Sequence, residues 1–121
     1  MSILSIDHVN IRTSRLAEMT DFYTTILGLE KGWRPQSNSV GAWIYSGDTA
    51  IIHLVEVDKL ADDAGNIDHF ALNGEDRDAF LAHLAQHEVE PETRLVADAG
   101  VQQVNIYDPD GNKLEVVFKL A

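Results

Sequence analysis

The stretch "IDHVNI" at residues 6–11 returns in the second half of the chain as "IDHFAL" at residues 67–72. His8 and His69 are 61 positions apart, and "IY…D" at 44–48 matches "IY…D" at 106–110 at an interval of 62. Intervals this similar, kept through separate segments, are typical of an internal duplication. The sequence therefore predicts two copies of one structural unit in tandem.

Each copy has the same predicted order of elements. In the first, an alternating strand at 3–12 precedes an apolar helical stripe that Ser14 can cap and Gly28 can end. Three strands follow, "LEKGWR" at 29–34, "GAWIYS" at 41–46 and "AIIHLVEV" at 50–57.

The second copy repeats this order. Asn73 with Asp76 can cap its helix. The strands are "IDHFAL", "EPETRL" at 90–95, "VQQVNIY" at 101–107 and, after a "DPDG" turn, "KLEVVF" at 113–118. We therefore expect an α+β fold in a single domain, 1–121, made of two tandem β-α-β-β-β modules. The modules span about 1–57 and about 67–121, and a polar linker at about 58–66 joins them.

Composition limits the classes of function. The 121 residues are 45% apolar and carry a net charge of −11, which argues against nucleic acid and against an anionic membrane surface. No apolar run is long enough to span a bilayer, so we expect a soluble, cytoplasmic domain. Cysteine is absent, so any metal site must use histidine and carboxylate side chains.

Four potential metal ligands occupy repeat-equivalent positions. His8 matches His69 on the first strands, and His53 matches Glu115 on the last strands. Each histidine alone could be an ordinary core residue, but a carboxylate among Leu114 and its apolar neighbours needs a compensating partner. If the two units face each other, the four side chains converge on a divalent metal, with His53 as a fourth ligand or a nearby acid/base.

The chain resembles the vicinal oxygen chelate superfamily, which includes glyoxalase I, extradiol dioxygenases and the fosfomycin- and bleomycin-resistance proteins. The resemblance rests on "DHVNIRT", "FYTTILGLE", "IIHLVEV", "DHFAL" and "DPDGNKLEV" and covers nearly the whole chain. It implies that each module curls into a half-barrel and that His8, His69 and Glu115 bind a metal between the modules. It also implies a homodimer. Whether the modules pair within a chain or across the dimer is left open.

This chain departs from glyoxalase I at His53, where that enzyme has a glutamate that moves the substrate proton. A histidine can still bind metal or accept a proton. Arg12, on the same strand face as His8, resembles the arginine with which bacterial glyoxalases hold a glutathione carboxylate, although it could be an ordinary exposed side chain. Strand alternation places further polar and aromatic side chains beside the predicted cavity: Asn10, Trp43, Tyr45, Gln103, Asn105 and Tyr107.

The resemblance and the predicted ligands together favour a metal-dependent lyase or isomerase of glyoxalase type, with His53 and Glu115 as catalytic residues. The metal would be iron, manganese, nickel, cobalt or zinc, and the substrate a small molecule with two vicinal oxygens. An iron(II) extradiol dioxygenase is the enzymatic alternative, because two histidines and one carboxylate are the ligands that iron oxygenases use. A ligand-binding protein of the bleomycin-resistance type, without catalysis, is the alternative of another class.

Overall fold

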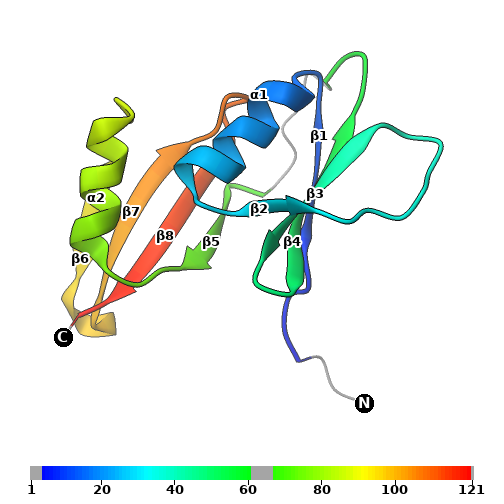
Figure 1. Cartoon of the computed structure of the whole chain (residues 1–121). Helices are drawn as coiled ribbons and strands as arrows, with labels where there is room; N and C mark the ends of the chain where they lie inside the picture. The colour runs from blue at the N-terminus through cyan, green and yellow to red at the C-terminus, as the bar shows by residue number, and fades with distance from the viewer. Residues whose placement is uncertain (1–3, 61–66, 121) are drawn as a thin grey trace. The chain divides into compact units, whose positions relative to one another are not determined.

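A computed structural model describes residues 4–60 and 67–120 of the chain. It divides into two compact units, Met1–Asp62 and Asp63–Ala121, and each has the element order β-α-β-β-β (Figure 1). The predicted α+β fold with two such modules is confirmed. Most of the predicted linker, residues 61–66, lies outside the described residues, and its boundaries stay a prediction. No helix in the described parts is long and apolar enough to cross a membrane.

The first unit is a four-stranded mixed sheet in the order β1-β4-β3-β2. The first and last strands of the unit pair in parallel, and the other neighbours are antiparallel. The elements are β1 (Val9–Thr13), α1 (Leu16–Asp21), a π-helical turn (Phe22–Ile26), β2 (Glu30–Gly32), β3 (Gly41–Ser46) and β4 (Thr49–Glu56).

The second unit has the same topology, with strand order β5-β8-β7-β6 and a parallel β5–β8 pair. Its register repeats that of the first unit, because Phe70 pairs with Leu114 as Val9 pairs with Ile52. The elements are β5 (His69–Asn73), α2 (Arg77–Gln86), β6 (Glu92–Val96), a 3-10 turn (Ala97–Ala99), β7 (Val101–Tyr107) and β8 (Lys113–Lys119).

One face of each sheet is apolar because alternate side chains along a strand point to the same side. In the first unit α1 packs against β3 and β4. In the second, α2 packs through Phe80, whose ring centre lies 5.7 Å from that of Phe118. The large aliphatic side chains of this face are fully buried: Ile44, Ile52, Leu54, Val104, Ile106 and Leu114.

The two helices begin differently. Asp76 caps α2 as predicted, and its carboxylate accepts a hydrogen bond of 3.2 Å from the Ala79 amide. The predicted Ser14 cap of α1 is wrong, because the helix starts after Arg15 and no side chain caps it. Instead the buried Thr13 hydroxyl accepts a hydrogen bond from the Arg15 amide at 3.0 Å. The end of β1 thereby fixes the turn into the helix.

The predicted "DPDG" turn before β8 is held by one buried carboxylate. Asp108 accepts hydrogen bonds from the amides of Asp110 and Asn112 and from the Asn112 side chain, at 2.8–3.0 Å. Gly111 has a φ of 83°, which favours glycine. The turn fixes where β8 begins, and therefore where Glu115 lies on it.

Core packing in the second unit predicts a contrast between two leucines. Leu114 is fully buried in β8, whereas Leu95 on β6 is 61% exposed. Leu114→Ala should lower the free energy of unfolding by about 2–5 kcal/mol, because it leaves a cavity. Leu95→Ala should change it by no more than about 0.5 kcal/mol. Chemical denaturation of both variants measures this contrast, and equal effects would contradict the assigned core face.

Candidate metal and substrate site

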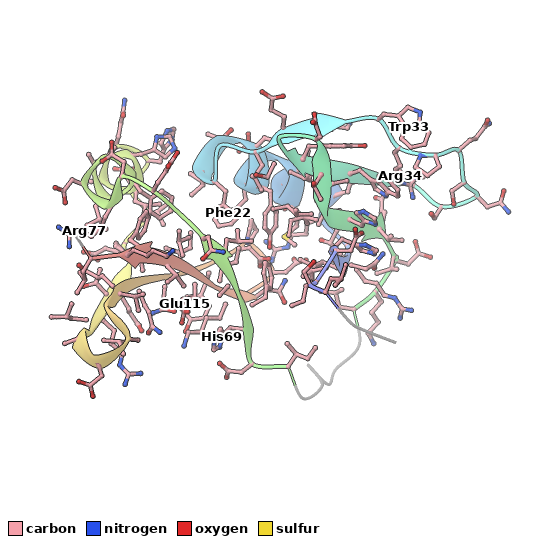
Figure 2. The ribbon with its side chains drawn as sticks, turned by 90° about the horizontal axis from the view of Figure 1, so that it is seen from below. Phe22, Trp33, Arg34, His69, Arg77 and Glu115 are labelled. Atoms are coloured by element: carbon pink, nitrogen blue, oxygen red, sulfur yellow. The ribbon has the colours of Figure 1, made fainter. Side chains whose placement is uncertain are left out.

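Two of the predicted ligands lie together in the second unit (Figure 2). His69 is the first residue of β5 and Glu115 lies in the middle of β8, its parallel neighbour. The His69 Nε2 atom is 3.7 Å from Glu115 Oε1, and the Glu115 side chain is only 13% exposed. This distance is too long for a hydrogen bond. Two ligands that bind one tetrahedral ion at about 2.1 Å lie about 3.4 Å apart, so the pair fits a shared cation.

An aspartate orients the His69 ring. The Nδ1 atom of His69 donates a hydrogen bond of 2.7 Å to Oδ2 of Asp68. With the proton on Nδ1, the neutral ring keeps its lone pair on Nε2, the atom nearer to Glu115. The hydrogen bond from His69 and the positive charge of Lys113 lower the pKa of Asp68. A carboxylate behind the imidazole is the usual support of a metal-bound histidine.

The first unit repeats this arrangement. The Nδ1 atom of His8 lies 2.8 Å from Oδ2 of Asp7, so its Nε2 atom is also left with the lone pair. Neither Asp7 nor Asp68 was among the predicted site residues. Both aspartates were nevertheless visible in the sequence, because each precedes the histidine in the repeated "IDH".

His53 stands in a column of three rings in the first unit. Its ring lies 3.8 Å from that of His8 and 3.9 Å from that of Trp43, and both pairs are stacked at 11°. The register explains the column, because Trp43 on β3 pairs with His53 on β4. His53 Nε2 lies 3.1 Å from the Ala50 carbonyl oxygen. A carbonyl only accepts, so Nε2 carries the hydrogen and Nδ1 keeps the lone pair.

The buried position of His53 affects its protonation. Burial of the ring, together with the neighbouring His8, lowers the pKa of His53 below its ordinary value of 6.5. The His53 ring is therefore neutral at neutral pH. Neutral imidazole is the form that can accept a proton or bind a metal.

The remaining predicted residues of the first unit share the His53 face of the sheet. Asn10 pairs with His53 in the β1–β4 register, and Arg12 follows two residues later as an exposed side chain. The side chain of Tyr45 is held within the first unit, because its hydroxyl donates a hydrogen bond of 2.7 Å to the Trp33 carbonyl. Its ring also covers Gly32, where a Cβ atom would lie 2.8 Å from it. Tyr45 therefore joins β3 to the chain around β2.

A pocket of about 410 Å³ opens on the corresponding face of the second unit. Its volume falls within the range usual for small-ligand sites. Of the predicted residues, Tyr107 does not line it and is half exposed. Four lining residues were missed, three on β6 and Lys113 on β8. The three on β6 were missed because the sequence assigned that strand no role, and the cavity forms only where β6 lies beside β7. The lining is His69, Glu92, Thr93, Arg94, Gln103, Asn105, Lys113 and Glu115.

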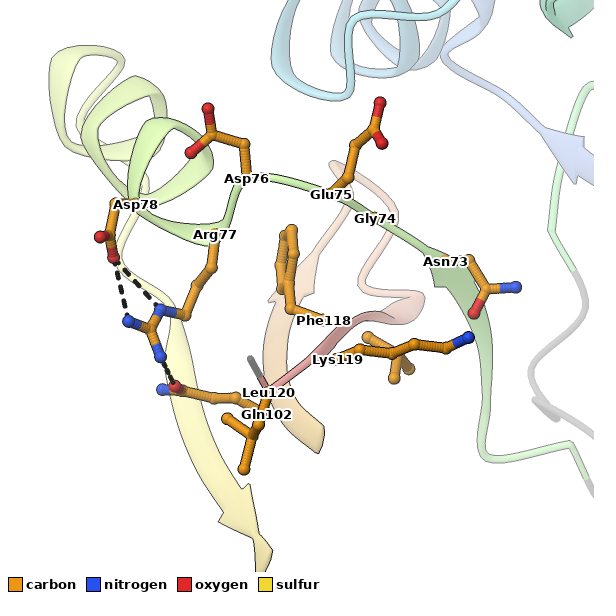
Figure 3. Close-up of a pocket in the computed structure, with 11 residues that line it drawn as sticks. Asn73, Gly74, Glu75, Asp76, Arg77, Asp78, Gln102, Phe118, Lys119 and Leu120 are labelled. Carbon is orange, nitrogen blue, oxygen red and sulfur yellow. Dashed lines mark hydrogen bonds and ion pairs between the residues drawn. The ribbon is translucent and has the colours of Figure 1, made fainter. Parts of the chain in front are cut away.

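A second hollow, of about 730 Å³, lies around the start of α2 (Figure 3). Arg77, one of its two cationic residues, is already paired, because the guanidinium donates to Asp78 Oδ1 at 3.1 and 3.2 Å and to Gln102 Oε1. Phe118 lines the same hollow and packs against α2. This hollow contains none of the predicted ligands, whereas the first pocket contains His69 and Glu115.

Within residues 4–60 and 67–120, potential ligands occur in pairs, and no group of three or more that could hold a metal is found. Two of these pairs consist of predicted ligands, His69 with Glu115 in the second unit and His8 with His53 in the first. In each of these units an aspartate holds a histidine with its Nε2 lone pair available. The side chains therefore fit a divalent metal by chemistry and by orientation.

The sequence profile of the Glyoxalase/Bleomycin resistance protein/Dioxygenase superfamily matches residues 5–116. The chain belongs to this superfamily. Among curated proteins, the Arabidopsis thaliana protein named Glyoxylase I 4 is 28% identical over 125 residues, which cover 96% of this chain and 71% of the plant protein. The superfamily includes enzymes and resistance proteins, and its members bind small molecules.

Solved structures of superfamily members share the fold. A glyoxalase family protein from Bacillus anthracis superposes with a TM-score of 0.81 at 24% identity, over 98% of both chains. A fosfomycin resistance protein from Listeria monocytogenes superposes with a TM-score of 0.73 at 20% identity, over 97% of this chain and 94% of the other. At these identities the likeness establishes the fold alone.

The supporting aspartates generate a prediction. Asp68→Ala removes the carboxylate that fixes the His69 ring, and should weaken binding of Zn²⁺ or Ni²⁺ by roughly 10- to 100-fold. Asp68→Asn keeps an acceptor oxygen for Nδ1 and should weaken metal binding less. Titration calorimetry on the folded variants measures both. If Asp68→Ala binds metal as tightly as the wild type, the aspartate does not orient a ligand.

His53 gives a pH-dependent prediction. Because its pKa is lowered by folding, its contribution to stability is complete above about pH 6.5 and is lost as the pH falls through that value towards the lower folded pKa. His53→Phe keeps a ring in the column but does not titrate. In metal-free protein, the melting temperature should therefore fall less in the variant than in the wild type between about pH 7.5 and pH 5.5. Scanning calorimetry measures both melting temperatures, and equal decreases in the wild type and the variant would contradict the lowered pKa.

Proposed function

We propose that this protein is a divalent-metal-dependent lyase or isomerase of glyoxalase type. Its substrate would be a small molecule that offers two vicinal oxygens to the metal. The observation that carries the proposal is the His69–Glu115 pair, with Asp68 holding the imidazole so that Nε2 lies toward the carboxylate. Membership of the superfamily and the 28% identity to a plant glyoxylase support the same reaction class.

The proposed ligands are His8, His69 and Glu115, as the sequence predicted. The first two are supported by their aspartate partners and the third by its nearly buried position beside His69. A bound iron, manganese, nickel, cobalt or zinc ion would supply Lewis-acid stabilisation of an oxyanion. Glu115 would thereby be both a ligand and a catalytic residue.

His53 is the proposed group for proton transfer, or else a fourth ligand, and in either role it would act through Nδ1. Its Nε2 atom is engaged by the Ala50 carbonyl, and its lowered pKa keeps the ring neutral and able to accept a proton. Trp43 and His8 hold the ring from its two faces, which restricts its rotation.

Substrate contacts are proposed on the same sheet faces. Gln103 and Asn105 line the pocket of the second unit, and Asn10 and Arg12 share the His53 face of the first. The aromatic residues Trp43, Tyr45 and Tyr107 complete the predicted set. The homodimer and the cytoplasmic location stay predictions.

An iron(II) dioxygenase is the second candidate, because the same ligands, two histidines and one carboxylate, are those of iron oxygenases. Conversion of a hemithioacetal to its thioester, followed as an increase in ultraviolet absorbance, would identify the lyase. Oxygen uptake with catechols and Fe²⁺ would identify the dioxygenase. Metal binding without either activity would favour a ligand-binding protein of the resistance type.

Removal of the carboxylate tests the metal directly. The wild type, freed of metal and then titrated by calorimetry, should bind about one Mn²⁺, Co²⁺, Ni²⁺ or Zn²⁺ per chain. Glu115→Gln should abolish this binding or weaken it at least about 100-fold, because an amide is a far poorer ligand than a carboxylate. Glu92→Gln is the matched control, since it neutralises a carboxylate of the same pocket outside the ligand set. Folded wild type that binds none of these ions would overturn the proposal.

A further inference from the structure

One polar atom in the pocket of the second unit has no partner. Asn105 lies on β7 and is only 9% exposed. Its Nδ2 atom donates to the Glu92 carbonyl at 3.4 Å, but its Oδ1 atom is buried without a hydrogen bond. Such an atom lowers the stability of the free protein, and a ligand that donates to it removes the deficit.

The surroundings of Asn105 determine what kind of ligand group it needs. In the sheet register Asn105 lies between Glu92 on β6 and Glu115 on β8. Both neighbours are carboxylates, and their oxygens accept hydrogen bonds as Oδ1 does. Turning the amide would not help, because Nδ2 would then leave the Glu92 carbonyl, which can only accept. Neither paired side chain can therefore donate to Oδ1, and the hydroxyl group of a ligand is a donor of the kind that this atom lacks.

The pocket also contains two cationic side chains, Arg94 on β6 and Lys113 on β8. Arg94 lines the same pocket, and on β6 it pairs with Gln103, two residues before Asn105 on β7. A side chain reaches such a diagonal neighbour at about 7–8 Å between backbone positions, and arginine is long enough to do so. No hydrogen bond or ion pair engages the Arg94 guanidinium among the described residues. Its fork of N–H donors suits a carboxylate.

We propose that Asn105 is a specificity-determining residue and that the substrate is a small hydroxy acid. The hydroxyl group donates its hydrogen bond to Asn105 Oδ1, and the carboxylate binds Arg94. This inference deepens the proposed function by naming the substrate class of the same pocket. Recognition by Asn105 and Arg94 needs no metal, so it can be tested apart from the metal chemistry.

The test uses the full chain freed of metal by a chelator, with three small acids as probes. Glycolate carries a carboxylate and a hydroxyl, methoxyacetate carries the same carboxylate with the hydroxyl hydrogen replaced by methyl, and acetate carries the carboxylate alone. Nuclear magnetic resonance titration should show glycolate shifting the side-chain signals of Asn105 and Arg94 together. Its affinity should exceed that of methoxyacetate and acetate by roughly 10-fold, the usual effect of satisfying one buried polar group.

Two variants separate the contributions. Asn105→Leu should remove the preference for glycolate over acetate while leaving the melting temperature unchanged or raised, because it deletes an unsatisfied polar atom. A merely structural asparagine would instead lower the melting temperature and keep the preference. Arg94→Gln should weaken glycolate and acetate equally.

The outcomes keep this inference distinct from the metal proposal. Equal binding of glycolate and methoxyacetate, or no binding of any probe at tens of millimolar, would overturn the hydroxy-acid assignment even if the protein binds metal. A preference for glycolate that disappears in Asn105→Leu would support it even if the wild type binds no metal.

Discussion

Parallel pairing of the first and last strand of each unit is the constraint on which the polar face of that unit depends. It sets Val9 opposite Ile52 and Phe70 opposite Leu114, so the apolar faces of both sheets are in equivalent register. With those pairs fixed, Asn10 faces His53, and Ala71 faces Glu115. A slip of one residue in either ladder would turn every side chain of the strand to the other face, which would bury the charged residues and expose the core. Core packing and the position of the polar groups are therefore maintained by the same hydrogen bonds.

Hydrogen bonds and ring stacking restrain the histidine side chains. Asp7 and Asp68 fix the tautomers of His8 and His69, and the stacked rings of Trp43 and His53 restrict the rotation of His8. Side chains held before a ligand arrives lose less entropy when it binds. The stacked rings also explain why His53 is neutral, since burial between them disfavours its charged form.

The two units differ in the character of their open faces. The face of the first unit is mainly aromatic, with Trp43 and His53 stacked and Trp33 against the edge of Trp43 at 5.9 Å. The face of the second is polar, with amides and charged groups around an unsatisfied Asn105 oxygen. A duplicated unit has thus kept its backbone register while its two copies carry different chemistry. The duplication therefore accounts for the fold, and the substitutions since then account for the candidate site.

The sequence by itself determined the duplication, the α+β class, the order of elements and the apolar core, because repeats and the two-residue period of strands are local properties. It also placed His8, His69, His53 and Glu115 at equivalent positions. Only the tertiary structure decided which groups meet. The 3.7 Å approach of His69 to Glu115, the ring column at His53 and the missing partner of Asn105 depend on pairing between strands that are distant in sequence. Alternation along a strand fixes the face on which a side chain lies. The neighbouring strands set the register and determine whether each polar group finds a hydrogen-bond partner, and the pattern of one strand carries no information about them.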